Sequence, residues 1–144
     1  MRTMIVGECW KGTALRGVFT SSWDVKTALT LGAYSGGNSN KLLISTGFKW
    51  GVSANLCPPS QWSTPVARRI ANALLAHEKP DIVLVFGQRA CHAFDIRVVW
   101  LQKQMIGDTT VFALPCPARA TTLWNLPEFQ EKLRAFTSGL RSVA

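Results

Sequence analysis

Hydrophobic residues along the chain fall into short apolar runs that alternate with longer stretches of helical spacing. The sequence Ile-Val-Leu-Val-Phe within 81–86 has no polar alternation, which is typical of a strand in a parallel sheet covered on both faces. Other runs end at turn-forming residues, such as Gly7 after the first and Pro58 after the second. The pattern predicts strands at 3–6, 52–56, 81–86 and 109–114.

The clearest helix is expected between the second and third strands. Thr64 is the expected N-cap, and Pro65 suits the first helical position because a proline lacks the N–H that is unpaired there. Three further helices are expected, one from a cap at Ser21 or Ser22 to Gly32, a short one after Gly87, and a C-terminal one from Pro127.

Strands that alternate with helices predict an α/β fold. We expect a three-layer sandwich with a mainly parallel central sheet flanked by helices. The sequence has no break in composition and no repeat, so it is interpreted as one domain covering residues 1–144.

The composition excludes a disordered chain, because 47% of the residues are hydrophobic and only 17% are charged. No apolar run approaches the roughly 20 residues of a membrane span, and the N-terminus has no secretory apolar region, so a cytoplasmic protein without a membrane partner is expected. Sixteen Lys and Arg residues against eight Asp and Glu give a net charge of +8, which favours a polyanionic partner, nucleic acid first. The alternative is a basic surface that only confers solubility.

The cysteines Cys9, Cys57, Cys91 and Cys116 are scattered, without a C-x-x-C pair. A structural zinc or cluster site normally needs paired spacing, so we expect no metal and no other cofactor. Reduced thiols are expected.

Chemistry is expected at the carboxyl ends of the strands, where open parallel α/β sheets bind ligands. Loops with polar or reactive residues follow three of the predicted strands, at 7–12, 55–59 and 115–125. We expect these loops to converge on one cleft.

Several short motifs occur in a particular order along the chain. They are Gly7-Glu8 after the first strand, Asn55 just before Pro58-Pro59, Phe86-Gly87-Gln88-Arg89, and Leu114-Pro115-Cys116-Pro117 followed by Trp124-Asn125. This set resembles the uracil-DNA glycosylase superfamily, with the family 4 and family 5 branches as its nearer relatives. The short chain is also similar to glycosylase-like proteins encoded by phages, for which the location would be the host cytoplasm rather than a cellular nucleoid.

The resemblance implies a metal-independent DNA N-glycosylase, acting as a monomer, that flips a base into a cleft. Asn55 would pair with the edge of the base and Phe19 would stack on it, while Gly7 allows close approach and Trp10 narrows the pocket or stacks. The alternatives are a turn residue for Asn55 and a core residue for Phe19.

Glu8 would hold a water near the sugar or stabilise positive charge on it. The alternative for Glu8 is a carboxylate that only binds backbone amides of its loop. Lys11, Arg119, Thr121 and Thr122 would contact the DNA backbone or groove.

Cys116 stands where the resemblance implies a histidine that donates to the departing base. A thiol is a weak donor, and one lost oxyanion donor typically costs on the order of 10²–10³ in rate. Cys9 and Cys116 follow strands that we expect to be neighbours, so either thiol is also a candidate nucleophile for modifying a base in place, given nearby cations. A DNA-binding module without catalysis is the remaining alternative.

Overall fold

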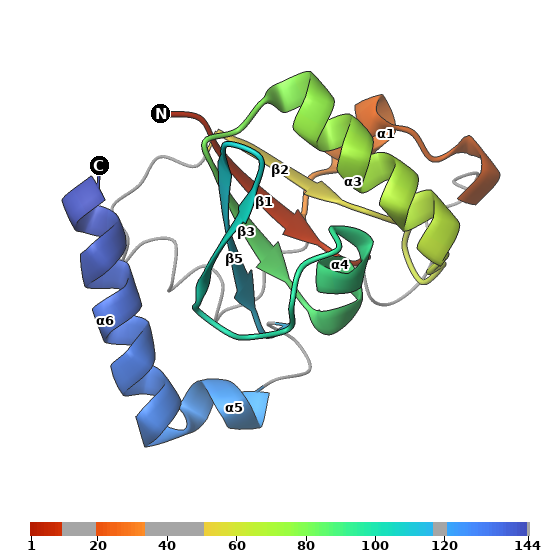
Figure 1. The fold of residues 1–144 in the computed structure, drawn as a ribbon. Coiled ribbons are helices and arrows are strands. Elements are labelled where there is room, and N and C mark those ends of the chain that lie inside the picture. The colour runs from red at the N-terminus through yellow and green to blue at the C-terminus, as the bar shows by residue number, and fades with distance from the viewer. Residues whose placement is uncertain (10–19, 34–50, 117–120, 144) are drawn as a thin grey trace.

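The protein is a five-stranded mixed sheet with helices on both faces (Figure 1). The computed structural model describes residues 1–9, 20–33, 51–116 and 121–143. The strand order is β2-β1-β3-β5-β4; the first four of these strands are parallel, and β4 runs antiparallel to β5. The strands are β1 (Thr3–Gly7), β2 (Val52–Asn55), β3 (Ile82–Phe86), β4 (Lys103–Ile106) and β5 (Thr109–Leu114).

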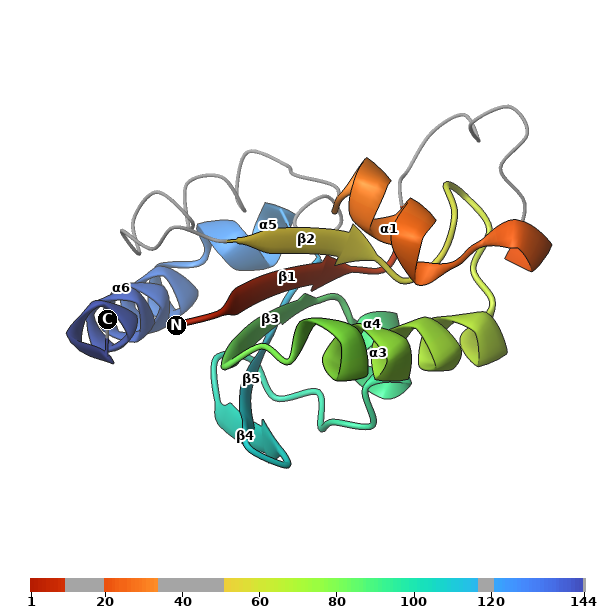
Figure 2. The same cartoon turned by 90° about the horizontal axis from the view of Figure 1, so that it is seen from above.

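Two apolar clusters lie on opposite faces of this sheet. Alternate residues of β1 and β3 supply both, with Met4 and Val85 in one cluster and Ile5 and Leu84 in the other. The first cluster packs under α1 (Val25–Leu31), α3 (Thr64–Glu78) and α4 (Gln88–Ala93). The second packs under α5 (Thr121–Asn125) and α6 (Pro127–Val143). Figures 1 and 2 show α3 and α6 on opposite sides of the sheet, so the three layers that the sequence predicts are present.

The structure confirms all four predicted strands to within a residue or two. Every residue of β3 is buried, which explains why its sequence lacks polar alternation. Two elements were not predicted. The edge strand β4 alternates between exposed and half-buried residues and joins β5 through Gly107, and α5 is a helix of five residues within a segment expected to be a loop.

Both specific cap predictions are wrong, although both helices exist. Ser63, not Thr64, caps α3 by accepting the N–H of Val66. Asp24 caps α1, since its carboxylate accepts the N–H of Thr27 at 2.7 Å. Ser22 belongs instead to a short 3-10 turn, Thr20–Ser22, and the buried Trp23 separates that turn from the helix.

Among the described residues, no helix combines the length and apolar character needed to cross a membrane.

Candidate functional site

The strand order marks one place on the carboxyl edge of the sheet where the connections between strands change direction. From β1 the chain moves outward to β2, whereas from β3 it moves the other way to β5. Neighbouring strands whose connections leave in opposite directions define the point where open α/β sheets bind ligands. Glu8 follows β1 at this point, and Gly87 follows β3.

Glu8 is bound to the start of α4 through both oxygens of its carboxylate. Oε2 accepts the backbone N–H of Arg89 at 2.8 Å, and Oε1 accepts the Nε–H of the same residue at 3.1 Å. The carboxylate lies so close to Gly87 that a Cβ there would stand 2.5 Å from Oε2. Gly87 also has φ +102°, a conformation that favours glycine. Two independent constraints therefore require glycine where β3 turns into α4.

Arg89 is itself supported by an aromatic ring. Its guanidinium lies 4.6 Å from the ring centre of Trp62, close enough for a cation–π contact. The indole N–H of Trp62 donates to Thr64 Oγ1 at 3.2 Å, which ties the ring to the first turn of α3. The Arg89 side chain is 40% exposed and that of Glu8 13%, so the ion pair is partly accessible to solvent.

Asn55 is the last residue of β2 and lies beside Gly7, the last residue of β1. Its side chain is fully buried, and a Cβ built on Gly7 would overlap Asn55 Oδ1. The two chains remain paired beyond the strands, because Leu56 N donates to Gly7 O and Cys57 N donates to Glu8 O. The structure therefore brings Gly7, Glu8 and Asn55 together at one edge, as the sequence predicts.

Two cysteines hold the loop that carries Trp62. Cys57 Sγ accepts the N–H of Ser63 and donates to its carbonyl oxygen, both at 3.4 Å. The backbone N–H of Ser60 binds Cys9, whose sulfur also lies 3.7 Å from Arg89 Nη2. The geometry gives both sulfurs a role as hydrogen-bonding groups within the fold.

Burial favours the protonated form of three thiols, those of Cys9, Cys57 and Cys91. Desolvation raises the pKa of Cys9 and of Cys57, and it raises the pKa of Cys91 to about 12. For Cys9 the Arg89 guanidinium acts in the opposite direction but is the smaller effect. A nucleophilic cysteine needs the opposite environment, one that lowers its pKa.

The expectation that Cys9 and Cys116 follow neighbouring strands is wrong. Strand β3 lies between β1 and β5, because β3 pairs with both of them. Cys116 is partly buried beyond the end of β5, at the same edge of the sheet. The strand order, which the sequence does not specify, separates the two sulfurs.

Other candidates cannot be placed. Trp10, Lys11, Phe19 and Arg119 lie outside the described residues, and the side chains of Thr121 and Thr122 at the start of α5 are also outside them.

Sequence reasoning missed Arg89 and Trp62 as site residues. Arg89 belongs to the motif Phe86-Gly87-Gln88-Arg89, so a signal was present, but nothing local in the sequence links it to Glu8, 81 residues away. Nothing local in the sequence distinguishes Trp62 from a packing residue.

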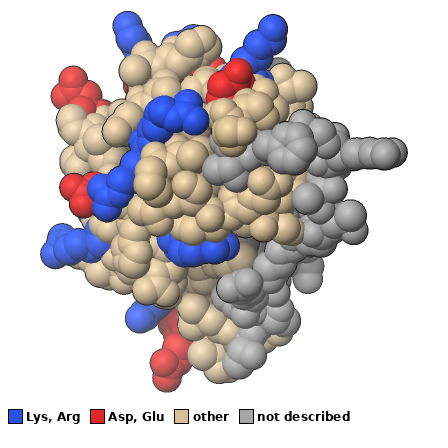
Figure 3. All heavy atoms as spheres, turned by 90° about the vertical axis from the view of Figure 1, so that its right-hand side faces the viewer, with Lys and Arg blue, Asp and Glu red and all other residues tan. Residues whose placement is uncertain are grey.

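The face shown in Figure 3 carries many basic side chains with fewer acidic ones between them. Arg68 is exposed on α3. Arg69 has a further role, since its Nη2 donates to the carbonyl oxygen of Trp23 at 2.9 Å and ties α3 to the segment before α1.

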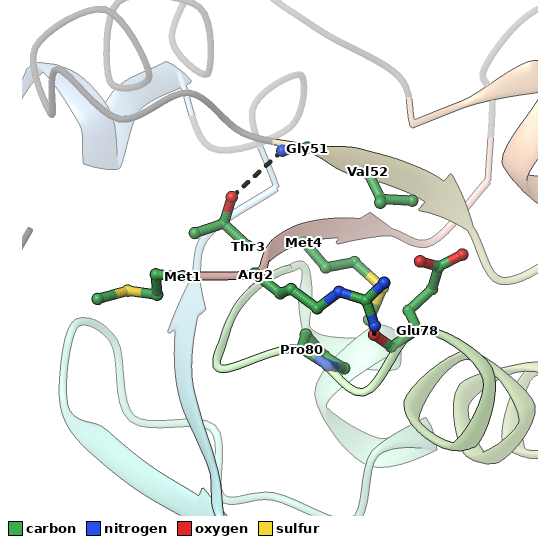
Figure 4. Close-up of a pocket in the computed structure, with 8 residues that line it drawn as sticks. All are labelled: Met1, Arg2, Thr3, Met4, Gly51, Val52, Glu78 and Pro80. Atoms are coloured by element: carbon green, nitrogen blue, oxygen red, sulfur yellow. Dashed lines mark hydrogen bonds between the residues drawn. The ribbon is translucent and has the colours of Figure 1, made fainter.

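A cavity of about 200 Å³ lies at the opposite, amino edge of the sheet (Figure 4). Arg2 lies along its wall and donates to the carbonyl oxygen of Glu78 at 2.7 Å, and Thr3 Oγ1 accepts the N–H of Gly51. Ligands of parallel sheets bind at the carboxyl edge, whereas this cavity lies at the other end of the strands from Glu8 and Asn55.

In the described ranges, no three His, Cys, Asp or Glu side chains gather into a group that could hold a metal ion. No protein-family model matches the chain, and no curated protein is significantly similar to it.

Proposed function

We propose that the chain is a DNA N-glycosylase of the uracil-DNA glycosylase type, which flips a base into a cleft formed at the carboxyl edge of the sheet and hydrolyses the N-glycosidic bond of uracil or a modified pyrimidine. One observation carries the proposal. Glu8 and Asn55, the polar residues that the sequence resemblance singles out, come from adjacent strands, and each lies over a glycine at the same edge of the sheet.

Asn55 is the group that reads the base. A side-chain amide offers one acceptor and two donors, which can pair with the edge of a pyrimidine. The contact with Gly7 fixes the orientation of this amide. Because Asn55 is fully buried, base pairing in this proposal requires the residues that cover it to move apart as the base enters. Pocket contacts of this kind offset the few kcal/mol that base flipping costs.

Glu8 acts at the sugar. Its carboxylate stabilises positive charge that develops on the deoxyribose as the glycosidic bond breaks, and it orients the attacking water. The hydrogen bonds from Arg89 hold this carboxylate at the switch point of the sheet.

Cys116 faces the departing base from the end of β5. Because its thiol is a weak donor, excision should be slower than with a strong donor at this position. Substitution Cys116→His is therefore expected to raise or broaden base release.

A base-release assay tests the proposal. The protein is incubated with oligonucleotides carrying uracil, hypoxanthine, xanthine or 5-hydroxymethyluracil, and alkali then cleaves any abasic sites. Release by the wild-type protein, lost in Glu8→Gln and Asn55→Asp variants that keep the wild-type Tm, is the expected result. Glu8→Gln keeps one acceptor for Arg89 but loses the negative charge and the second acceptor, so a loss of activity there reports on the carboxylate as a whole.

A DNA-binding module without catalysis is the second candidate, and a specific observation favours it. Both oxygens of Glu8 already bind Arg89, which is also what a purely structural carboxylate would do. DNA binding that is unchanged in every variant, with no base released by any protein, would favour this candidate.

Modification of a base in place by a cysteine is the third candidate. It has less support at Cys9, because burial raises the pKa of that thiol. Full activity of Cys116→Ser would argue against it at Cys116.

A further inference from the structure

The guanidinium of Arg89 is held from several directions at the switch point. Nε donates to Glu8 Oε1 at 3.1 Å, Nη2 lies 3.7 Å from Cys9 Sγ, and the central carbon lies over the ring of Trp62, 4.6 Å from its centre. A planar group with an edge contact and a face contact has little rotational freedom left. Arg89 is thus a rigid element although its side chain is 40% exposed.

The hydrogen bonds from Arg89 also restrict the Glu8 carboxylate. The backbone N–H of Arg89 holds one carboxylate oxygen and the Nε–H holds the other, so the carboxylate cannot rotate about its last torsion without breaking a hydrogen bond. Each carboxylate oxygen has two lone pairs, and Arg89 uses one on each. Among the described residues no donor other than Arg89 binds these oxygens, so one lone pair on each can accept a hydrogen bond from water.

We propose that Arg89 is a positioning residue for the reaction, and that Trp62 positions Arg89 in turn. Through this pair the Glu8 carboxylate is held in the one orientation that directs a water at the sugar. The inference rests on the proposed glycosylase function and adds two residues to it. It differs from a purely structural tie, in which the ion pair would serve the stability of α4 alone.

The contacts predict which substitutions are tolerated. Lysine at position 89 keeps the charge but has neither the Nε–H donor nor a plane to lie on the ring. Phenylalanine at position 62 keeps an aromatic face, whereas leucine removes it and keeps much of the bulk.

The test compares chemistry with binding. Single-turnover base release at saturating protein is measured for Arg89→Lys, Arg89→Met, Trp62→Phe and Trp62→Leu, together with the Kd for the same oligonucleotide and the Tm. Arg97→Ala is the control for the loss of one positive charge, because Arg97 is exposed beyond α4. We expect both Arg89 variants and Trp62→Leu to lose on the order of 10–100-fold in rate, the loss typical of a misplaced group, while the Kd changes by less than about threefold. Trp62→Phe keeps a ring but loses the indole N–H to Thr64, so its rate should lie between those of Trp62→Leu and the wild type, and the Arg97→Ala control should keep the wild-type rate.

Wild-type rates in Arg89→Met or Trp62→Leu would overturn the positioning role while leaving the glycosylase proposal intact. A rate loss that only parallels losses in Tm and in DNA affinity would also overturn it, since a structural tie predicts that pattern. If Arg89→Met does not fold, the rates of the two Trp62 variants test the positioning role instead, because these variants leave Arg89 in place. A wild-type protein that releases no base would overturn the proposed function itself, a result distinct from the others.

Discussion

The carboxylate of Glu8 lies directly over Gly87, where a Cβ would stand 2.5 Å from Oε2 and 2.7 Å from the carboxyl carbon. Glu8 follows β1 and Gly87 follows β3, so this contact joins the two strands at which the sheet changes direction. The neighbouring strand repeats the relationship, with the Asn55 side chain over Gly7. Each of these two polar side chains therefore depends on a glycine at, or directly after, the end of the neighbouring strand.

Gly87→Ala should destabilise the protein and displace Glu8. The added methyl meets the carboxylate at a φ of +102°, and strain and overpacking together should lower the free energy of unfolding by roughly 2–5 kcal/mol. Gly107→Ala is the matched control, because Gly107 has φ +57° and nothing within 4 Å of a Cβ. Its cost should be only about 1–2 kcal/mol. If urea unfolding gave the same loss of unfolding free energy for Gly87→Ala and Gly107→Ala, the contact between Gly87 and Glu8 would be contradicted.

Gly7→Ala should move the Asn55 amide. The new methyl would overlap Oδ1 of a fully buried side chain, at a cost of about 1–3 kcal/mol, and base recognition should be lost with it. Gly51→Ala provides the comparison, since its Cβ would lie 3.7 Å from the Thr3 carbonyl oxygen, an ordinary contact. Thermal unfolding of the two variants should differ clearly, and a Gly7→Ala protein as stable as Gly51→Ala would show that Asn55 is free to move.

Cys91 should be inert in the folded protein. With a pKa raised by burial to about 12, only about one thiol in 10⁴ is ionised at pH 8. Titration with a chromogenic disulfide reagent should modify the partly buried Cys116 first and Cys91 only on unfolding. Rapid reaction of Cys91 at pH 8 would contradict the burial.

The same shift sets a pH dependence of stability. A thiol whose folded pKa is raised favours the folded state below the unfolded pKa near 8.5, and this contribution is lost as the pH rises toward about 12. Cys91→Ala should therefore lose less stability than the wild type between pH 8 and pH 11, as measured by urea unfolding.

DNA binding should weaken steeply with salt. The chain carries a net charge of +8, and neutralised phosphates release counterions, so the affinity for an oligonucleotide should fall by at least about tenfold between 50 and 200 mM salt. An oligonucleotide without the target base should show a similar slope, because the phosphates are the same. Fluorescence anisotropy that gives a constant affinity over this range would argue against DNA as the partner.

Local sequence patterns were sufficient to predict the strands and the main helices. The unbroken apolar run in β3 and the proline near the start of α3 act over a few residues, and their physical effects do not depend on the rest of the chain. The same reasoning placed Gly7, Glu8 and Asn55 at one edge, since carboxyl ends of parallel strands share an edge. Caps were harder to predict, because neighbouring residues such as Ser63 and Thr64 have similar intrinsic preferences.

The strand order and the partners of each site residue required the tertiary structure. Nothing within β1 or β5 specifies that β3 lies between them, and that order separates Cys9 from Cys116. Arg89 meets Glu8 across 81 residues of sequence, and it meets Trp62 only because α4 and the loop before α3 pack at the same edge. Such contacts depend on how whole layers pack together, so no short stretch of the chain encodes them.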